Sequence, residues 1–227
     1  MKNVLIVPCV TKVLNTIFDY DQSCCMINCV MAISNLRFSQ FDNIFFVLYK
    51  EIDEKYKISQ KINADIMRLG SIPNKIKIVT VDKMTSSPAE TVYTVIETIS
   101  SIYKNEDFSV FIKDADNMFH NSNVPYDNAL FVASLEDMEL VDPIHKSYVK
   151  LDEQGFVTNC IERRVISDKF IAGGYSFRSA NIYKEAYDAL KTNHEKFYIS
   201  DIVFWLILNK NEKFLPVEAE LFTDFNI

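Results

Sequence analysis

Short apolar runs alternate with amphipathic stretches through the first half of the chain. Each run is rich in β-branched and aromatic residues and stays apolar at consecutive positions, as strands do when helices cover both of their faces. The runs lie at 3–8, 43–49, 75–81 and 109–114. The sequence therefore predicts four buried strands in this half.

Helical patterns fill the intervals between these strands, at 22–36, 51–70 and 88–103. In the second interval apolar residues recur near the i, i+3, i+4 spacing of one helix face, and Gly70 marks its end. Pro88 suits the start of the third helix, where its missing N–H would have no partner in any case. The β-α-β-α-β-α-β order predicts an α/β fold with a mostly parallel, doubly wound sheet.

The pattern changes after residue 120, where strands and helices no longer alternate. Strands are predicted at 128–136, 147–162, 170–179 and 214–220, and helices at 180–191 and 199–210. The segment 147–162 turns back as a hairpin in which Gly155 supplies a positive φ, and Ser200 is the predicted cap of the last helix. Because no repeat or linker is visible, the expected organisation is a single domain over 1–227 with a mixed sheet.

Composition narrows the class of protein. Five cysteines without a C-x-x-C pair argue against a disulfide framework or a zinc ribbon and indicate a reducing compartment. No signal peptide is visible and no apolar run approaches the roughly 18 residues of a membrane span, so we expect a cytoplasmic protein without membrane insertion. A net charge of -7 argues against nucleic acid as a partner. The net charge does not exclude small anionic ligands, because a bound divalent cation supplies positive charge locally.

Two aspartates, Asp114 and Asp116, end the strand at 109–114. Open α/β sheets bind ligands beyond the carboxyl ends of their strands. Two carboxylates at this spacing can reach one Mg²⁺, which typically takes one or two carboxylates plus phosphate oxygens. A polar turn leaving the strand is the alternative interpretation. Asp224, at the end of a later strand, is either a further ligand or a solvent-facing residue near the end of the chain.

Two other segments carry candidate ligand contacts. TSSPAETVY, at 85–93, places small hydroxyl residues at a helix entrance, where free N–H groups suit a base edge or an anion. A helix simply capped by Ser87 is the alternative. In IERRVISDKF, side chains alternate along a strand, so only one of Arg163 and Arg164 can face the crevice and pair with a phosphate.

Taken in order, these segments resemble the sugar-nucleotide nucleotidyltransferases of the GT-A fold, which join a nucleoside triphosphate to a sugar phosphate, and their glycosyltransferase relatives. KNVLIVP is similar to the family's first strand, TSSPAETV to its base-contacting segment, and FIKDADNMF to the strand whose aspartate binds Mg²⁺. YVKLDEQGFVTNCIERRVIS resembles the hairpin that ends in a sugar- and phosphate-binding glutamate and lysine. IAGGYSFRSA, KFYISDIV and LFTDFNI continue the resemblance, which implies a GT-A-like three-layer α/β/α fold.

The resemblance also implies a set of site residues. The metal ligands would be Asp114, Asp116 and Asp224, binding Mg²⁺ or, in its place, Mn²⁺. Contacts to nucleotide and sugar are expected at Pro8, Ser86, Ser87, Ala89, Lys113, Glu162 and Gly174. The catalytic set would be Lys12 and Arg163, which hold phosphates, together with Asp116.

One departure from the family concerns the loop after the first strand. Family nucleotidyltransferases wrap the triphosphate with a glycine-rich loop that carries Arg and Lys. Here that place reads CVTKVLNTIFDYDQ, with no glycine, no arginine and Lys12 as its single lysine. Backbone N–H groups approach phosphate most closely where no Cβ intervenes, so this mechanism is weakened.

Three functions therefore stay open. The leading hypothesis is a nucleotidyltransferase-like enzyme of capsule or surface-polysaccharide precursor synthesis. The alternatives are a metal-dependent glycosyltransferase that takes a ready-made nucleotide sugar, and a catalytically degenerate nucleotide-binding domain. Family members continue beyond their last aspartate, so a longer polypeptide with a fused or associated biosynthetic domain is also expected.

Overall fold

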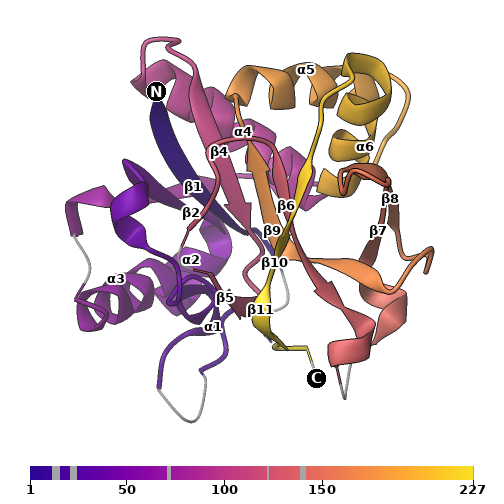
Figure 1. Ribbon diagram of the computed structural model, residues 1–227. Helices are drawn as coiled ribbons and strands as arrows, with labels where there is room; N and C mark the ends of the chain where they lie inside the picture. Colours follow the sequence, from indigo (N-terminus) through magenta and orange to yellow (C-terminus); the bar gives the residue numbers. More distant parts are fainter. Residues whose placement is uncertain (12–15, 21–24, 71–72, 122, 139–141, 227) are drawn as a thin grey trace.

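A mixed β-sheet separates two layers of helices (Figure 1). The structure is a computed structural model and describes residues 1–11, 16–20, 25–70, 73–121, 123–138 and 142–226. In this part of the chain the sheet runs in the order β10-β6-β9-β4-β1-β2-β3, with β7 joined to β9 and β8 to β7. The strands are β1 (Lys2–Cys9), β2 (Asn43–Tyr49), β3 (Ile76–Val81), β4 (Phe108–Lys113), β6 (Ala129–Ser134), β7 (Ser147–Leu151), β8 (Val157–Glu162), β9 (Lys169–Phe177) and β10 (Leu215–Glu218).

The first four strands form the parallel part of the sheet. β1 lies between β2 and β4 and is parallel to both, and β3 is parallel to β2. β9 then runs antiparallel between β4 and β6. The bounds of the strands predicted in the first half of the chain are confirmed within one residue at each end, as are the three-layer α/β/α fold and its mostly parallel, mixed sheet. The predicted burial is wrong for β3, which lies at the edge of the sheet with Lys77 and Thr80 exposed.

Alternate side chains of β1 enter different halves of the core. Val4 and Ile6 pack with the layer formed by α4 (Pro88–Ile102), α5 (Ala180–Lys191) and α6 (Ile199–Lys210). Leu5 and Val7 pack with α1 (Asn28–Met31) and α3 (Ile58–Arg68) on the opposite face. This double burial is the physical reason that β1 is apolar at consecutive positions.

Two predicted helices differ from the structure. The helix expected at 51–70 is divided into α2 (Lys50–Tyr56) and α3 at Lys57, which has a φ of 55°. The carboxylate of Asp53 accepts a hydrogen bond from the N–H of Ser59 at 2.7 Å, and this new N-terminal contact restarts the helix.

The helix expected at 22–36 is also shorter than predicted. Residues 21–24 lie outside the described residues, and the helical part is α1. The N–H groups of Asn28 and Cys29 donate to the carbonyls of Asp19 and Ile17, both at 2.9 Å. These bonds to a preceding loop replace the helical hydrogen bonds that an earlier start would need.

Helix caps test the predicted boundaries closely. Ser87 caps α4 as predicted, since its Oγ accepts from the N–H of Glu90 at 3.3 Å with Pro88 at the first helical position. The predicted cap at Ser200 is wrong. α6 has the predicted bounds, but its N-cap residue is Tyr198, and the carboxylate of Asp201 accepts a hydrogen bond from the Tyr198 N–H at 2.7 Å.

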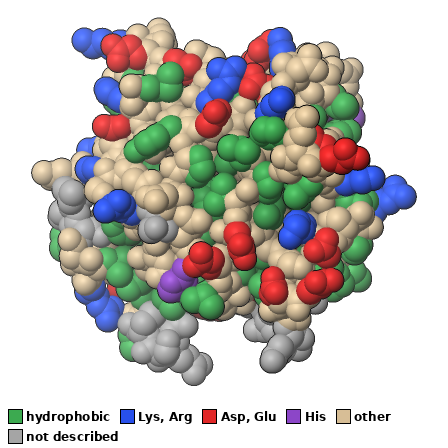
Figure 2. Space-filling view, in the orientation of Figure 1, with side chains coloured by type: hydrophobic (Ala, Val, Ile, Leu, Met, Phe, Trp, Pro, Cys, Tyr) green, Lys and Arg blue, Asp and Glu red, His purple; other side chains and the backbone are tan. Residues whose placement is uncertain are grey.

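A second, two-stranded sheet was not predicted. β5 (Asn117–His120) pairs antiparallel with β11 (Glu220–Asp224), the segment that ends near the C-terminus in Figure 1. Acidic side chains gather in the lower part of the face shown in Figure 2, near the lower ends of β10 and β11. No helix within the described residues is long and apolar enough to cross a membrane.

Candidate active site

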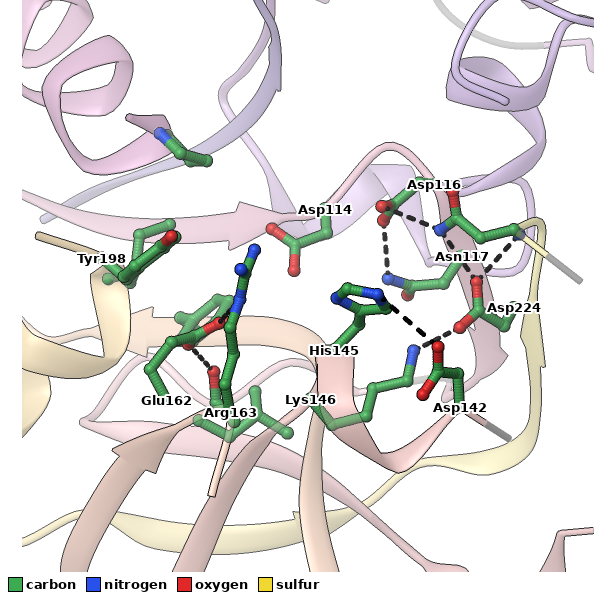
Figure 3. Close-up of a pocket in the computed structure, with 16 residues that line it drawn as sticks. Asp114, Asp116, Asn117, Asp142, His145, Lys146, Glu162, Arg163, Tyr198 and Asp224 are labelled. Atoms are coloured by element: carbon green, nitrogen blue, oxygen red, sulfur yellow. Dashed lines mark hydrogen bonds and ion pairs between the residues drawn. The ribbon is translucent and has the colours of Figure 1, made fainter. Parts of the chain in front are cut away.

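A cavity of about 630 Å³ opens where β4 ends and β5 and β11 begin to pair. Asp114 and Asp116 line one side, and Lys146, Glu162 and Arg163 face them (Figure 3). Its carboxylates are Asp114, Asp116, Asp142, Glu162 and Asp224, and its cations are Lys146 and Arg163, with His145 beside them. The cavity therefore has an excess of negative charge.

Lys113 holds the turn that presents the two aspartates. Its side chain is fully buried, and Nζ donates to the carbonyls of Asp114 and Asn117, both at 2.9 Å, and to Asn117 Oδ1 at 2.6 Å. Asn117 Nδ2 in turn donates to Asp116 Oδ1 at 3.1 Å. A buried cation with three acceptors thus fixes the backbone from which Asp114 and Asp116 project.

The electrostatics of this turn are dominated by burial. Burial, reinforced by the negative charge of Asp116, raises the pKa of Asp114 to about 7, against the opposing effect of Lys113. Burial lowers the pKa of Lys113 to about 8, although both aspartates raise it. Removal from water, more than the neighbouring charges, is therefore the cause of both pKa shifts.

We expect Lys113→Met to lower the free energy of unfolding by about 1–3 kcal/mol, because it leaves buried carbonyl groups without a donor. Chemical denaturation would measure this change. Lys77→Met, at an exposed position of β3, is the matched control and should stay within about 0.5 kcal/mol of the unsubstituted protein. Equal stability of the Lys113→Met and Lys77→Met variants would show that the buried ammonium group does not support the turn.

The pairing of β5 with β11 brings a distant carboxylate to the same place. Asp224 lies opposite Asn117 in this register, and the N–H of Phe225 donates to the carbonyl of Asp116 at 2.9 Å. Asn226 Nδ2 donates both to Asp116 Oδ2, at 3.2 Å, and to Asp224 Oδ1, at 2.9 Å. One amide group therefore bridges the two carboxylates.

Asp224 also forms an ion pair with Lys146. Lys146 comes from the turn that leads into β7, and its Nζ bonds to Asp224 Oδ2. Burial by itself would raise the pKa of Asp224, but the hydrogen bonds from Lys146 and Asn226 outweigh it and leave the pKa below its ordinary value.

Glu162 and Arg163 form the opposite side of the cavity. Glu162 Oε2 accepts hydrogen bonds from the hydroxyl groups of Ser147 and, at 3.1 Å, of Ser200. The guanidinium of Arg163 lies 5.8 Å from the centre of the Tyr198 ring. β8 ends at Glu162 and Arg163 has a φ of 56°, so strand alternation does not decide which arginine faces the cavity. Arg163 lines it, and Arg164 is exposed outside the lining.

A histidine and an aspartate lie at the rim. His145 Nε2 is 3.5 Å from Asp142 Oδ2, and both side chains are more than half exposed. Tyr148 anchors this loop by donating its hydroxyl hydrogen to the carbonyl of Pro143 at 2.9 Å.

Five of the predicted site residues line this cavity, and the others lie elsewhere. The five are Asp114, Asp116, Glu162, Arg163 and Asp224. Those outside the lining are Pro8, Ser86, Ser87, Ala89, Lys113 and Gly174, and Lys12 lies outside the described residues. The base-contacting segment borders the cavity only through Pro88, since Ser87 caps α4 and Ala89 is buried.

Gly174 and Lys113 are enclosed by other protein groups and do not face the cavity. A Cβ added to Gly174 would lie 2.9 Å from atoms of Phe119 and Phe131, so this glycine packs against the aromatic core. Lys113 pairs with it in the β4–β9 register and is occupied by its three protein acceptors. Neither residue reaches a ligand in this cavity directly.

Four residues that line the cavity were not predicted as site residues from the sequence. They are Lys146, Asn117, Tyr198 and Asn226. Lys146 is one lysine among many at a strand entrance, and its role depends on the pairing of β11 with β5. Asn226 gave no signal in the sequence, because its amide reaches Asp116 only when β11 pairs with β5.

The carboxylate oxygens in this cavity are the kind of ligand that a hard divalent cation prefers. They do not surround a single position. Among the described residues no three His, Cys, Asp or Glu side chains lie close enough together to hold a metal ion. Mg²⁺ needs only one or two carboxylates when phosphate oxygens and water complete its shell. Asp114, Asp116 and Asp224 bring carboxylate oxygens to one cavity, where one or two of them would serve as ligands of this kind.

Comparison with solved structures shows that the chain shares its α/β fold with three enzymes that are named as pyrophosphorylases or nucleotidyltransferases. A nucleoside-diphosphate-sugar pyrophosphorylase from Vibrio cholerae RC9 superimposes with a TM-score of 0.75 at 17% identity, over 98% of this chain and 96% of the other. The inositol-1-phosphate CTP transferase from T. maritima gives 0.69 at 15% identity, over 98% and 89%. A putative glucose-1-phosphate thymidylyltransferase from Bacillus anthracis, in complex with a sucrose, gives 0.66 at 14% identity, again over 98% and 89%.

The sequence itself adds no closer relationship. No protein-family model matches the chain, and no curated protein matches it. At these identities the likeness establishes the fold, and the activity has to be argued from the cavity.

Proposed function

We propose that the protein is a divalent-cation-dependent enzyme that transfers a nucleotidyl group from a nucleoside triphosphate to a sugar phosphate or a similar phosphate. The observation that carries this proposal is the convergence of Asp114, Asp116 and Asp224 at a cavity whose other side holds Glu162 and Arg163. The neighbours in fold support it, because their names describe pyrophosphorylase and nucleotidyltransferase activities.

In the proposed reaction an oxygen of the acceptor phosphate attacks the α-phosphorus in line. The bond from that phosphorus to the bridging oxygen of the β-phosphate breaks, and pyrophosphate leaves. A divalent cation, when bound, would neutralise negative charge on the phosphates. One or two of the carboxylates of Asp114, Asp116 and Asp224 would hold it, with phosphate oxygens and water as its other ligands.

The remaining groups orient the acceptor. Arg163 carries a planar cation suited to a phosphate group, and the nearby Tyr198 ring helps to hold its guanidinium. Glu162 is kept in place by two serine hydroxyl groups and would accept hydrogen bonds from sugar hydroxyl groups. We further propose that the product is a sugar nucleotide for capsule or surface-polysaccharide synthesis, made in the cytoplasm where nucleoside triphosphates are available.

The test is an activity panel. The protein is incubated with each nucleoside triphosphate, a set of sugar phosphates and Mg²⁺ or Mn²⁺, and pyrophosphate release is followed. Release that requires both substrates and the metal is expected for at least one combination. Its absence across the panel, with a folded protein, would contradict the proposal.

Glycosyl transfer from a nucleotide sugar is the second candidate. It is favoured by the segment at 9–22, which contains no glycine to wrap a triphosphate. Calorimetric titrations would separate the two functions. Mn²⁺-dependent binding of nucleoside diphosphates without binding of triphosphates would favour the glycosyltransferase.

Arg163→Ala is expected to lower kcat/KM by about 10–100-fold, mainly through the KM of the phosphate-bearing acceptor, because a charge-assisted bidentate contact is lost. Arg164→Ala, which removes the same charge outside the cavity, should change kcat/KM less than about twofold. Steady-state kinetics with varied acceptor measure both variants. Similar losses in the two would argue that net charge, rather than a contact of Arg163, affects the rate.

A further inference from the structure

Lys146 is the most enclosed cation among the residues that line the cavity. Its side chain is 11% exposed, and that of its partner Asp224 is 6% exposed. On its other sides Nζ lies 5.2 Å from the centre of the Phe222 ring and 5.8 Å from that of Phe170. The backbone is also fixed, because the carbonyl of Lys146 accepts a hydrogen bond from the N–H of Arg163 at 2.9 Å.

Protein donors occupy the space that a cation would take beside Asp224. Lys146 bonds to Oδ2, while Oδ1 accepts from the backbone N–H and the side-chain amide of Asn226, both at 2.9 Å. The same amide reaches Asp116 Oδ2 at 3.2 Å. The carboxylates of Asp116 and Asp224 are thus neutralised and bridged from within the chain.

Charge balance indicates where Lys146 would go when this arrangement changes. Five carboxylates line the cavity against the permanent cations Lys146 and Arg163. A divalent ion on Asp224 would compete with the ammonium group for the same oxygens. Since aromatic rings attract a cation less strongly than an anion does, a displaced ammonium group would favour the phosphate of a bound ligand.

We propose that Lys146 is an exchangeable counter-cation, which neutralises Asp224 in the free protein and moves to a ligand phosphate when a divalent cation takes its place. This inference rests on the proposed function in two respects, that the ligand carries phosphate and that a divalent cation binds beside Asp224. It assigns to Lys146 part of the phosphate binding that a glycine-rich loop performs elsewhere. It also couples the two ligands, because each favours the arrangement that the other needs.

The test compares Lys146→Met with the matched control Lys150→Met, at an exposed position of β7, the strand that follows Lys146. Mn²⁺ affinity without any nucleotide is measured by electron paramagnetic resonance, and affinity for inorganic pyrophosphate in saturating Mn²⁺ by calorimetry. Removing the competing ammonium group should raise Mn²⁺ affinity about tenfold and lower pyrophosphate affinity about tenfold. Lys150→Met should leave both affinities within about twofold of the original.

Opposite shifts in the two affinities distinguish this role from a structural one. The proposal is overturned if both affinities fall together or if both stay unchanged. It is also overturned if the unsubstituted protein and the Lys146→Met variant both fail to bind Mn²⁺ at millimolar concentration. If Lys146→Met does not fold, Lys146→Arg decides the question. Because Lys146→Arg keeps the charge, its Mn²⁺ affinity should stay within about threefold, and a tenfold gain would overturn the proposal. These binding measurements do not require turnover, so a protein inactive in the panel can still show the exchange.

Discussion

Asp116→Asn is expected to lower the rate of pyrophosphate release by at least about a thousandfold. Asp116 lies between Asp114 and Asp224 in the cavity and is joined to Asp224 through the amide of Asn226. The substitution keeps the shape of the side chain and removes one of the negative charges that would hold a divalent cation. Loss of the charge stabilisation that a cation supplies is worth several kcal/mol, and about 4 kcal/mol corresponds to a thousandfold in rate.

The control for this experiment is Asp82→Asn, the same chemical change at a side chain that is 80% exposed and pairs with Lys50 on the surface. Surface pairs contribute about 0–1 kcal/mol, so Asp82→Asn should leave the rate within about twofold. Mn²⁺ binding, followed in parallel, should weaken only in the Asp116→Asn variant. Full activity of Asp116→Asn would remove Asp116 from the catalytic set.

Gly173→Ala is expected to lower the free energy of unfolding by about 3–5 kcal/mol and to weaken Mn²⁺ binding. Gly173 has a φ of 75° at an irregularity in the β6–β9 register. An added Cβ would lie 2.5 Å from Asn117 Nδ2 and 2.9 Å from Asp114 Cβ. The Asn117 side chain cannot move away freely, because Lys113 and Asp116 both bond to it. Left-handed backbone strain and overpacking therefore add.

Gly155→Ala separates the two causes. Gly155 also has a positive φ, of 85°, but nothing lies within 4 Å of the position of an added Cβ. We expect it to cost about 1–2 kcal/mol from backbone strain alone and to leave Mn²⁺ binding unchanged. Denaturant unfolding and Mn²⁺ titration of both variants provide the measurements. Equal costs at the two positions would argue that the contact with Asn117 does not constrain the site.

The parallel half of the fold could be predicted because a strand that is buried on both faces has apolar residues at consecutive positions. β1 is apolar from Val4 to Cys9 because alternate side chains enter the two halves of the core. The break at Lys57 could not be predicted in the same way. It depends on a left-handed backbone at one lysine and on the contact of Asp53 with Ser59, neither of which alters the apolar spacing.

The candidate site was predictable to the extent that it depends on strand ends. Asp114 and Asp116 follow directly from the end of β4, and the family resemblance pointed to Asp224. Lys146 and Asn226 could not be found, because their roles arise only when β11 pairs with β5 and brings distant segments together. Ser200 illustrates the same limit. It was predicted as a helix cap, and its hydroxyl group instead holds Glu162.

The most direct test of the central claim is a crystal structure of the protein soaked with Mn²⁺ and a nucleoside triphosphate, with the metal located by its anomalous scattering. We expect a metal peak in the cavity beside Asp116 and Asp224, next to phosphate oxygens, with Lys146 turned from Asp224 to the ligand. A nucleotide bound elsewhere, or bound in the cavity with the Lys146–Asp224 ion pair intact and no metal beside it, would contradict the account.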